Sequence, residues 1–580
     1  MRSTPRIVWL IVAVAVAICR PCPAAAAQES KSRPEVWTLP GLERALRDAL
    51  AGPNKKAVVH AARNEWESFQ IALRSPARVR ITDVAVGPLR GPLGAALPAG
   101  SITLFREHQL NLTIPSRENK DFHEGWYPDA LIPFRHPMTG ERLTGGRFQA
   151  VPFDLPADET HAFWIDVHVP RDAAAGTYSG EVAVKIEGAD PIAVPVEILV
   201  WDFALPERAA MYTEMCGTPA ERMRRYYGDL VKKGAVAKLP DFGPIQEQCA
   251  QLETDHRLNT PPPSDLLADS RREDGSFDLT PEQLAGLRGW AGKYHLTAIA
   301  VPGPDRRFKN PVADRDKINR WLKSWDRAAD AAGLGDRLLY TYLIDEPNTR
   351  TAYDFIRRWG SVVRQSGSRV KVLVTEQPKS QDLAWGDLYG AIDIWVPLFP
   401  LFDPETGRAR QERGEQIWTY TALCQGKKPT PWWQTDFPIV NYRAPAWIGW
   451  RYQMKGLLYW AGLSFWYHVE DTWTDPKTYQ PGNRSRPIAK REIYNGEGLL
   501  VYPARDVGFD GVVPSMRLKA IRDGLEDFDY LTILESRGLR DKALEVVMPV
   551  AGSWYEWAKD AGPYLKARDH LAALILEGKK

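Results

Sequence analysis

The sequence predicts a multidomain protein in which an N-terminal antiparallel β-sandwich precedes a (β/α)8 barrel of the TIM type with C-terminal helices. Short alternating segments separated by Gly, Pro and Asp fill the first part of the chain. After Pro206 apolar runs alternate with amphipathic stretches, as in a parallel barrel. A chain of 580 residues is also too long for one ordinary domain. We predict a signal peptide at 1–27, the sandwich at 34–206, the barrel at 207–513 and a helical segment packed on it at 514–580.

The N-terminus has the pattern of a secretory signal. A basic end precedes an apolar core at Ile7–Ile18 and small residues at Ala24–Ala27. This core is too short to cross a bilayer. Cys19 and Cys22 raise the alternative of a lipid anchor, but Ile18 stands where a lipoprotein signal requires a small residue. We therefore expect an exported protein, periplasmic or extracellular.

Composition argues against several function classes. Basic and acidic residues nearly balance, 75 against 73, which gives no reason to propose a nucleic acid or an anionic membrane as partner. Beyond the signal only Cys216, Cys249 and Cys424 remain, and none belongs to a Cys-x-x-Cys pair. The ten histidines show no His-Glu-x-x-His spacing. We expect neither a metal nor a cofactor.

The sandwich is predicted from four segments that alternate at period two, with turn residues between them: Glu67–Leu73, Phe163–Val169, Tyr178–Ile186 and Ile192–Val200. A helix is expected here only at Leu42–Leu50.

The barrel is predicted from eight strand candidates, which are Met211–Met215, Arg257–Thr260, Thr297–Pro302, Leu338–Ile344, Val370–Thr375, Ile392–Pro397, Thr430–Gln434 and Leu457–Phe465. Amphipathic helices are expected between them, at Lys317–Ala332, Thr351–Gln365 and Ala444–Tyr452. An open doubly wound sheet is the alternative, but no Gly-x-Gly-x-x-Gly follows the first strand. The tail from Ser515 onward is expected to be helical, with Leu544–Trp557 and Tyr564–Leu576 continuing the pattern.

The run Leu338–Ile344 is the strongest strand candidate, because it is apolar, aromatic and β-branched throughout. It ends at Asp345 and Glu346, and Pro347 follows. Two carboxylates at the end of a buried parallel strand lie where barrel enzymes keep their catalytic residues. The structural alternative is that Asp345 caps a turn and Glu346 begins the next helix.

Tryptophan is concentrated near the predicted site: ten of the 22 fall between Trp385 and Trp473. Trp447 and Trp450 share a helix face and are expected to pack in the core, but others follow strand candidates. Rigid amphipathic rings around a cleft suit a sugar. Acidic residues also stand at other predicted strand ends, at Glu376, Asp393 and Asp436. The substrate-binding candidates are Tyr342, Asn348, Trp395, Trp432, Gln434, Asp436, Trp460 and Asn495.

Adjacent carboxylates on one strand do not naturally flank a glycosidic bond. They suit a substrate-assisted route, in which the 2-acetamido oxygen of the sugar attacks the anomeric carbon. Asp345 would then orient the acetamide nitrogen while Glu346 protonates the leaving oxygen. The proximity of like charges would raise the pKa of one of the two carboxyls.

Six segments make the chain similar to glycoside hydrolase family 123: YLIDEPN (Tyr342–Asn348), VLVTEQP (Val372–Pro378), DIWVP (Asp393–Pro397), GLLYW (Gly456–Trp460), NGEGLLVYP (Asn495–Pro503) and PSMRLKAIRDGLEDFDYL (Pro514–Leu531). The preceding β region resembles the N-terminal sandwich of that family. The resemblance implies an exo-acting β-N-acetylgalactosaminidase with a (β/α)8 catalytic barrel. It also implies that Asp345 stabilises an oxazolinium-like intermediate and that Glu346 is the general acid/base. The charged segment Arg517–Tyr530 is interpreted mainly as structural, pinning the C-terminal helix through ion pairs.

Two alternatives remain open at this point. In the first, a retaining glycosidase of other specificity uses Glu346 as acid/base and Asp436 as a covalent nucleophile. In the second, the chain is a glycan-binding protein without catalytic activity. In all three cases the expected partner is a glycan or glycoconjugate.

Overall fold

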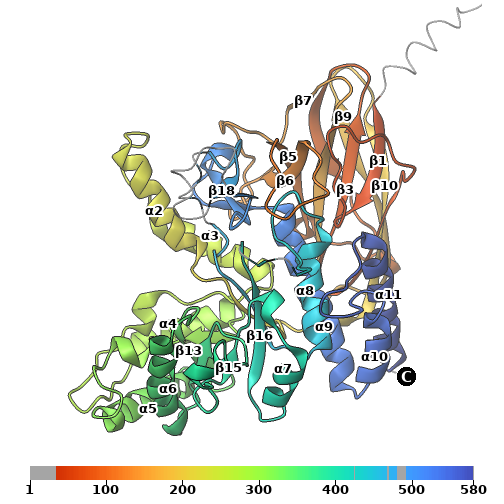
Figure 1. Ribbon diagram of the computed structural model, residues 1–580. Helices are drawn as coiled ribbons and strands as arrows, with labels where there is room; N and C mark the ends of the chain where they lie inside the picture. Colours follow the sequence, from red (N-terminus) through yellow and green to blue (C-terminus); the bar gives the residue numbers. More distant parts are fainter. Residues whose placement is uncertain are drawn as a thin grey trace, which may run out of the picture.

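The computed structural model describes residues 34–423, 425–426, 428–464, 466, 469, 471–479 and 492–578. The predicted signal peptide and Cys424 lie outside these ranges. The described chain forms a β-rich domain, a parallel barrel and a group of C-terminal helices that contacts both (Figure 1). Cys216 and Cys249 are free thiols.

The N-terminal domain consists of two packed sheets of five described strands each. The first sheet is antiparallel, in the order β1 (Glu35–Pro40), β3 (Glu65–Arg74), β8 (Thr160–Val169), β5 (Ile102–Leu112) and β6 (Gly125–Pro133). The second has the order β2 (Ala57–Arg63), β10 (Ile192–Ala204), β9 (Gly176–Ile186), β4 (Val79–Val86) and β7 (Phe153–Leu155). Only β2 and β10 pair in parallel among these described strands. Apolar side chains of both sheets form one core between them.

The helix expected at Leu42–Leu50 is wrong, because this segment consists of turns. Three of its backbone carbonyls accept hydrogen bonds from the sandwich. The Thr160 amide donates to the Arg47 carbonyl at 2.7 Å, and the Thr160 hydroxyl donates to the Ala49 carbonyl at 2.6 Å. The Gln70 amide likewise donates to a carbonyl of this segment. Tertiary hydrogen bonds thus override the local helix pattern.

The barrel sheet contains seven described strands, all parallel, and is nearly closed. Their order is β11 (Tyr212–Glu214), β17 (Gly456–Tyr459), β16 (Gln416–Thr421), β15 (Ile394–Trp395), β14 (Lys371–Val374), β13 (Leu338–Ile344) and β12 (Ala298–Ala300). The candidate at Thr430–Gln434 is wrong: this stretch is a loop, and the strand before it is β16. Pro429 and Pro431 cannot donate to a central ladder, whereas β16 carries aromatic and β-branched residues from Ile417 to Thr421.

The candidate at Arg257–Thr260 is also not a regular strand, but it lies between the two edge strands of the barrel. The Asn259 amide donates to the Thr213 hydroxyl of β11 at 2.7 Å. On the other side, the Asn259 side chain donates to the Ala298 carbonyl of β12 and accepts from the Ala298 amide, at 3.1 and 3.0 Å. One side-chain amide therefore takes the place of a backbone ladder.

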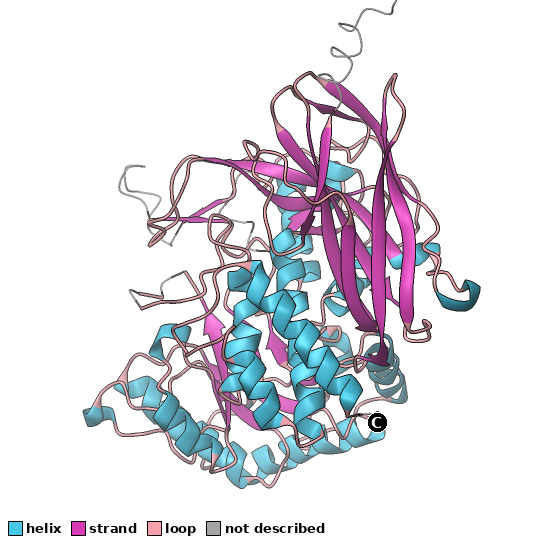
Figure 2. Ribbon diagram, turned by 90° about the vertical axis from the view of Figure 1, so that its right-hand side faces the viewer, coloured by secondary structure: helices cyan, strands magenta, loops and turns pink. Residues whose placement is uncertain are grey.

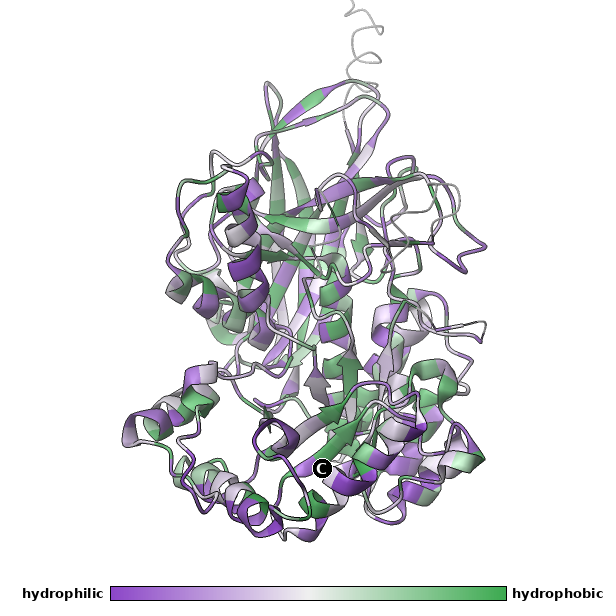
Figure 3. Cartoon of the chain, turned by 60° about the vertical axis from the view of Figure 1, so that its left-hand side comes forward, coloured by the Kyte–Doolittle hydropathy of each residue, from purple (hydrophilic) through white to green (hydrophobic). Residues whose placement is uncertain are grey.

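Helices surround the barrel sheet (Figure 2). They are α2 (Pro219–Lys232), α3 (Phe242–Asp255), α4 (Pro281–Lys293), α5 (Arg315–Ala331), α6 (Arg350–Gln365), α7 (Pro404–Gln411) and α8 (Val440–Arg451). The helix α6 illustrates why they form. The Thr349 hydroxyl caps its first turn, and Tyr353, Ile356 and Val363 recur on its buried face. The strands are among the most hydrophobic segments of this domain, while the outer faces of the helices are polar (Figure 3).

Three helices follow the barrel: α9 (Met516–Ser536), α10 (Arg540–Val547) and α11 (Ala561–Glu577). The expected helix at Leu544–Trp557 is thus largely wrong, since α10 ends at Val547. Two short antiparallel pairs precede α9, namely β18 (Lys477–Tyr479) with β19 (Ile493–Asn495), and β20 (Val501–Pro503) with β21 (Val512–Pro514). Among the described helices, none combines the length and the apolar composition needed to cross a bilayer.

The helix α9 is buried between the sandwich and α8, and its charges explain how it is held. Arg517 forms a bidentate ion pair with Asp129 of β6, with N–O distances of 2.7 and 2.8 Å. Arg522 bonds to Asp166 of β8 at 2.9 Å. On the opposite face Arg443 of α8 pairs with the α9 carboxylate Asp527. The ion pairs therefore join the helix to both domains.

Burial also leaves one sandwich carboxyl without a hydrogen-bond partner among the described residues. Glu107 of β5 is 1% exposed, and burial raises its pKa to about 8, against a smaller opposing effect of Arg44. A carboxyl with a folded-state pKa above its unfolded value stabilises the fold at low pH, and this contribution is lost as pH rises through about 8. The shift corresponds to roughly 3–5 kcal/mol between pH 4 and pH 9.

Replacement of Glu107 by glutamine should remove this pH dependence. We expect Glu107→Gln to be more stable than the parent at pH 9 by roughly 2–4 kcal/mol and to differ little at pH 5. Urea unfolding at both pH values measures the difference. Glu187→Gln, at an exposed turn, is the matched control and should change neither value. An equal effect of Glu107→Gln at both pH values would contradict the prediction.

Candidate active site

The strand β13 sets the positions of the two carboxylates that follow it. Leu339 and Leu343 belong to the core between sheet and helices, whereas Tyr340 and Tyr342 pack in the barrel interior. This alternation follows from the pleat of the strand. The strand ends at Ile344, so Asp345 and Glu346 emerge at the C-terminal end of the parallel sheet, and both side chains are exposed.

Asp345 is held through one of its two oxygens. The Tyr342 hydroxyl and the Thr375 hydroxyl both donate to Oδ1, each at 2.8 Å. Among the described residues no donor bonds to Oδ2. Two donors on one oxygen fix the orientation of the carboxylate. The second oxygen is thereby free to accept a hydrogen bond from a ligand.

Glu346 is held through its backbone and one oxygen. Its amide donates to the Thr375 hydroxyl oxygen at 2.7 Å, and its Oε1 accepts from the Tyr420 hydroxyl at 2.5 Å. The backbone φ is +40°, which places a residue with a side chain in the left-handed region. Oε2 has no donor among the described residues. A proton on Oε2 would be exposed and ready for transfer.

Further polar groups surround the pair. Glu376, next to Thr375, is buried, and burial raises its pKa to about 7, with a further contribution from the charge of Glu346. Burial and the neighbouring carboxylates also raise the pKa of the Tyr342 and Tyr420 hydroxyls, so both remain protonated donors. The Tyr340 hydroxyl donates to Glu214 at the end of β11.

Two residues of this network were not among the sequence-predicted site residues. Thr375 lies at the end of β14 and touches both Asp345 and Glu346. Tyr420 lies on β16, the strand that the sequence interpretation missed. The aromatic alternation of Trp418 and Tyr420 was the signal that could have found it.

Two predicted binding residues share the barrel interior with the pair. Tyr342 bonds to Asp345 directly, and the half-buried Trp460 packs in the same aromatic cluster as Tyr342 and Tyr420. The Trp460 indole N–H donates to Glu497 at 2.7 Å. Asn348 is exposed in the loop that follows Glu346. These three residues remain candidates for sugar contacts.

Trp395 is wrong as a cleft residue. Its side chain is 1% exposed and belongs to the core between the sheet and the helices. Its indole N–H donates to the buried Glu415 at 2.7 Å. The neighbouring Ile394 faces the barrel interior instead, so the pleat turns Trp395 outward.

The prediction that Gln434 and Asn495 line an open cleft is also wrong. Gln434 is fully buried and donates to Glu497. Asn495 is 1% exposed, and its amide side chain donates to the Ile114 carbonyl of the sandwich at 2.8 Å. Both amides satisfy internal carbonyls or carboxylates, which accounts for their burial.

Asp436 anchors the sandwich to the barrel. Its carboxylate accepts from the Ser116 amide and hydroxyl at 2.8 and 2.5 Å and from the Asn119 side chain at 3.0 Å. It is 8% exposed, and the strand that was expected to present it at the barrel mouth does not exist. Asp436 therefore does not stand at the end of a barrel strand, where its interpretation as a nucleophile places it, while sugar binding by Asp436 stays a prediction.

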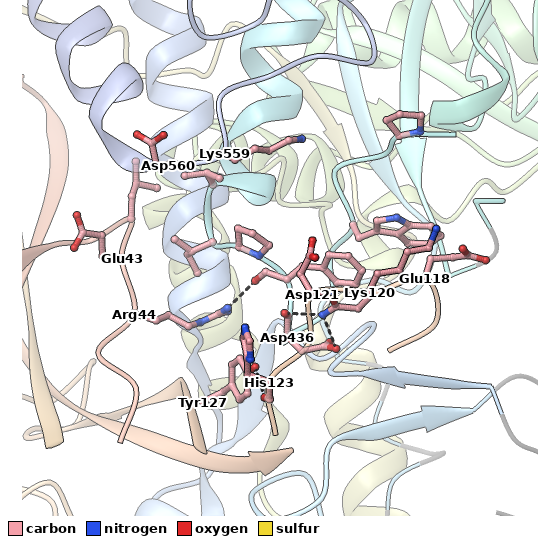
Figure 4. A pocket seen from close by; sticks show the side chains of 18 of the residues that line it. Glu43, Arg44, Glu118, Lys120, Asp121, His123, Tyr127, Asp436, Lys559 and Asp560 are labelled. Atoms are coloured by element: carbon pink, nitrogen blue, oxygen red, sulfur yellow. Dashed lines mark hydrogen bonds between the residues drawn. The ribbon is translucent and has the colours of Figure 1, made fainter. Parts of the chain in front are cut away.

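Trp432 and Asp436 line a separate cavity of about 910 Å³ between the sandwich, the barrel loop and the C-terminal segment (Figure 4). Arg44 and Tyr127 contribute from the sandwich and Lys559 from the C-terminal part. Trp432 is 6% exposed and stacks on Phe437, so it is wrong as a wall of the site at β13. Neither Asp345 nor Glu346 lines this cavity.

Within the described ranges, His, Cys, Asp and Glu side chains do not gather in any group suited to a metal ion. The groups at the mouth of the barrel are instead two exposed carboxylates with tyrosine and threonine donors. This arrangement can bind a neutral polar ligand and transfer a proton to it.

Residues 52–186 match the glycoside hydrolase 123 N-terminal domain, and residues 319–534 match the glycoside hydrolase 123 catalytic domain. The second match contains β13 and both carboxylates. No curated protein matches the chain.

Solved structures give a likeness of fold. A family 123 glycoside hydrolase from Clostridium perfringens, studied for glycolipid glycan hydrolysis, is similar over 94% of this chain and 97% of its own, with a TM-score of 0.61 and 14% identity. A family 39 glycoside hydrolase from Bacteroides cellulosilyticus WH2 matches with a TM-score of 0.30 and 10% identity, over 77% of this chain and 82% of its own.

Both domain models come from one family, and together they cover more than half of the chain. The structural likeness over nearly the whole length extends the same architecture to the parts between them. This protein therefore belongs to glycoside hydrolase family 123.

Proposed function

We propose that the protein is an exported glycosidase that removes terminal β-linked N-acetylhexosamine, with N-acetylgalactosamine as the preferred sugar. The observation that carries the proposal is the pair of exposed, adjacent carboxylates Asp345 and Glu346 at the end of β13. Family membership supports glycan hydrolysis. Export rests on the signal-like pattern at 1–27. We also infer that 257–260 takes the place of the eighth barrel strand, which completes a (β/α)8 arrangement.

The proposed reaction retains the anomeric configuration and uses the acetamido group of the substrate. The acetamido oxygen attacks the anomeric carbon while the bond to the leaving oxygen breaks. Glu346 gives that oxygen its proton, and the free Oδ2 of Asp345 accepts the acetamide N–H. Water then attacks the same carbon from the face that the leaving group occupied. Glu346 takes a proton from this water, and the acetamido group is restored.

The network around the carboxylates fits these separate roles. Asp345 has two donors on Oδ1, which suits a group that keeps one orientation throughout the reaction. Glu346 has one donor, from Tyr420, and is free at its second oxygen. The nucleophile comes from the sugar, so no third carboxylate at 5 Å is required.

A pair of aryl glycosides tests the proposal. An aryl β-N-acetylgalactosaminide should be hydrolysed at least about 10²-fold faster than the aryl β-galactoside, because only the first carries an internal nucleophile. The matching α-linked substrates are the control and should not react. An N-acetylgalactosamine thiazoline, which resembles the cyclic intermediate, should inhibit. Equal rates for the two β-substrates would eliminate substrate assistance. Sugar binding without turnover would instead indicate a glycan-binding protein.

A further inference from the structure

Thr375 is placed to act on both catalytic candidates at once. It follows the last residue of β14, beside β13 in the barrel sheet, and is 4% exposed. Its hydroxyl donates to Asp345 Oδ1 at 2.8 Å and accepts from the Glu346 amide at 2.7 Å. A hydroxyl has one hydrogen and two lone pairs, so it can make these two bonds together.

The backbone at Glu346 requires such a partner. Its φ of +40° is disfavoured for any residue with a Cβ, and it follows an irregularity in the pairing of β13 with β14 between Tyr342 and Ile344. In this conformation of the turn, the amide of Glu346 donates to the Thr375 hydroxyl oxygen at 2.7 Å. The bond to Thr375 therefore stabilises the backbone that presents the Glu346 carboxyl to solvent.

The same hydroxyl decides which oxygen of Asp345 is available. Together with the Tyr342 hydroxyl, it occupies Oδ1 and leaves Oδ2 free. Of the two carboxylates, Tyr342 bonds only to Asp345 and Tyr420 bonds only to Glu346. Of the described side chains, Thr375 alone has hydrogen bonds to both residues.

We propose that Thr375 is the positioning residue that fixes the mutual geometry of Asp345 and Glu346. This inference rests on the proposed function, because it assigns to the two carboxylates the roles given above. Thr375 does not react with the substrate itself. Its contribution is to keep one carboxylate oriented and the other presented, so that both reach the sugar in the same complex.

The test compares valine and serine at this position. Thr375→Val keeps the shape of the side chain and removes the hydroxyl, whereas Thr375→Ser keeps the hydroxyl and removes the methyl group. With an aryl β-N-acetylgalactosaminide, we expect Thr375→Val to lower kcat about 10²-fold with KM changed less than threefold. The kcat and KM of Thr375→Ser should both stay within about threefold of the parent values. Thermal unfolding is measured on each variant, and Thr375→Ala replaces valine if that variant does not fold.

The choice of leaving group distinguishes the effect of the Thr375–Asp345 hydrogen bond from that of the Thr375–Glu346 hydrogen bond. A 2,4-dinitrophenyl substrate needs little help from an acid. If the variant impaired Glu346 alone, its decrease in kcat would therefore be smaller with this substrate. We expect the loss in Thr375→Val to persist, because Asp345 is also displaced. The proposal is overturned if a folded Thr375→Val or Thr375→Ala variant keeps kcat within threefold of the parent. An equal loss in Thr375→Ser would overturn it too, since the methyl group would then be what matters.

A crystal structure of Thr375→Val gives a readout that does not depend on the reaction. The Glu346 backbone should leave the left-handed region, or the Asp345 carboxylate should rotate. An unchanged turn together with an unrotated Asp345 carboxylate would overturn the inference even if the parent enzyme is active. If the parent shows no preference for the acetamido sugar, the proposed function fails, while this structural comparison still decides the role of Thr375.

Discussion

Glu346→Gln should lower kcat for an aryl β-N-acetylgalactosaminide by about 10²–10⁴-fold, the usual range for loss of a general acid. Glutamine keeps the shape of the side chain and can still accept the hydrogen bond from Tyr420 at Oε1. It has no transferable proton for the leaving oxygen. KM should change little, because the exposed Glu346 contributes one contact at most to binding of the ground state.

Leaving groups of different acidity make this prediction specific. Loss of an acid should cost about 10²-fold less with 2,4-dinitrophenolate, which departs without a proton, than with an alkoxide. Asp345→Asn is the matched comparison, because the decrease in kcat of this variant should be similar for both leaving groups. Glu405→Gln, on the exposed first turn of α7, controls for loss of a surface carboxylate and should be silent. A Glu346→Gln enzyme with nearly full kcat would remove Glu346 from the mechanism.

The sequence predicted β13 with its observed bounds, because a run that is apolar on both faces leaves few alternatives. The positions of the two carboxylates followed directly from the end of that strand. The prediction was wrong at Thr430–Gln434, which is a loop, and it missed β16. The inward side chains of β16 are Trp418 and Tyr420, whose aromatic rings alternate with polar residues, so its apolar run is broken.

Errors among the binding residues share this origin. With the wrong strand, Asp436 and Gln434 were expected at the barrel mouth, but they lie in a loop that is bound to the sandwich and to Glu497. Trp395 was assigned to the correct strand but to the inner face of the barrel sheet, whereas its side chain lies on the outer face. A strand of two residues is too short to show an alternation of inward and outward side chains. The network of Thr375 joins neighbouring strands, and such contacts depend on strand order and register. A single sequence contains no direct signal for either.

The ion pair between Arg517 and Asp129 offers a second large effect, on stability. Both side chains are fully buried, and the pair joins α9 to β6 of the sandwich. Asp129 also accepts from the Tyr502 hydroxyl at 2.5 Å. Asp129→Asn keeps the volume but leaves the Arg517 charge without its carboxylate, apart from two backbone carbonyls. Removal of one partner of a buried pair costs about 3–5 kcal/mol.

Chemical denaturation at pH 7 should therefore show a loss of about 3–5 kcal/mol for Asp129→Asn, or a separate early transition if the sandwich detaches from the barrel first. Glu412→Gln is the control, because its ion pair with Arg408 is exposed and should be worth less than about 1 kcal/mol. The double variant Asp129→Asn with Arg517→Met should recover part of the loss, since it no longer buries an unpaired charge. If Asp129→Asn cost no more than the exposed control, the polar surface of α9 would not be what holds the sandwich against the barrel. The apolar residues of that helix would then carry the interface alone.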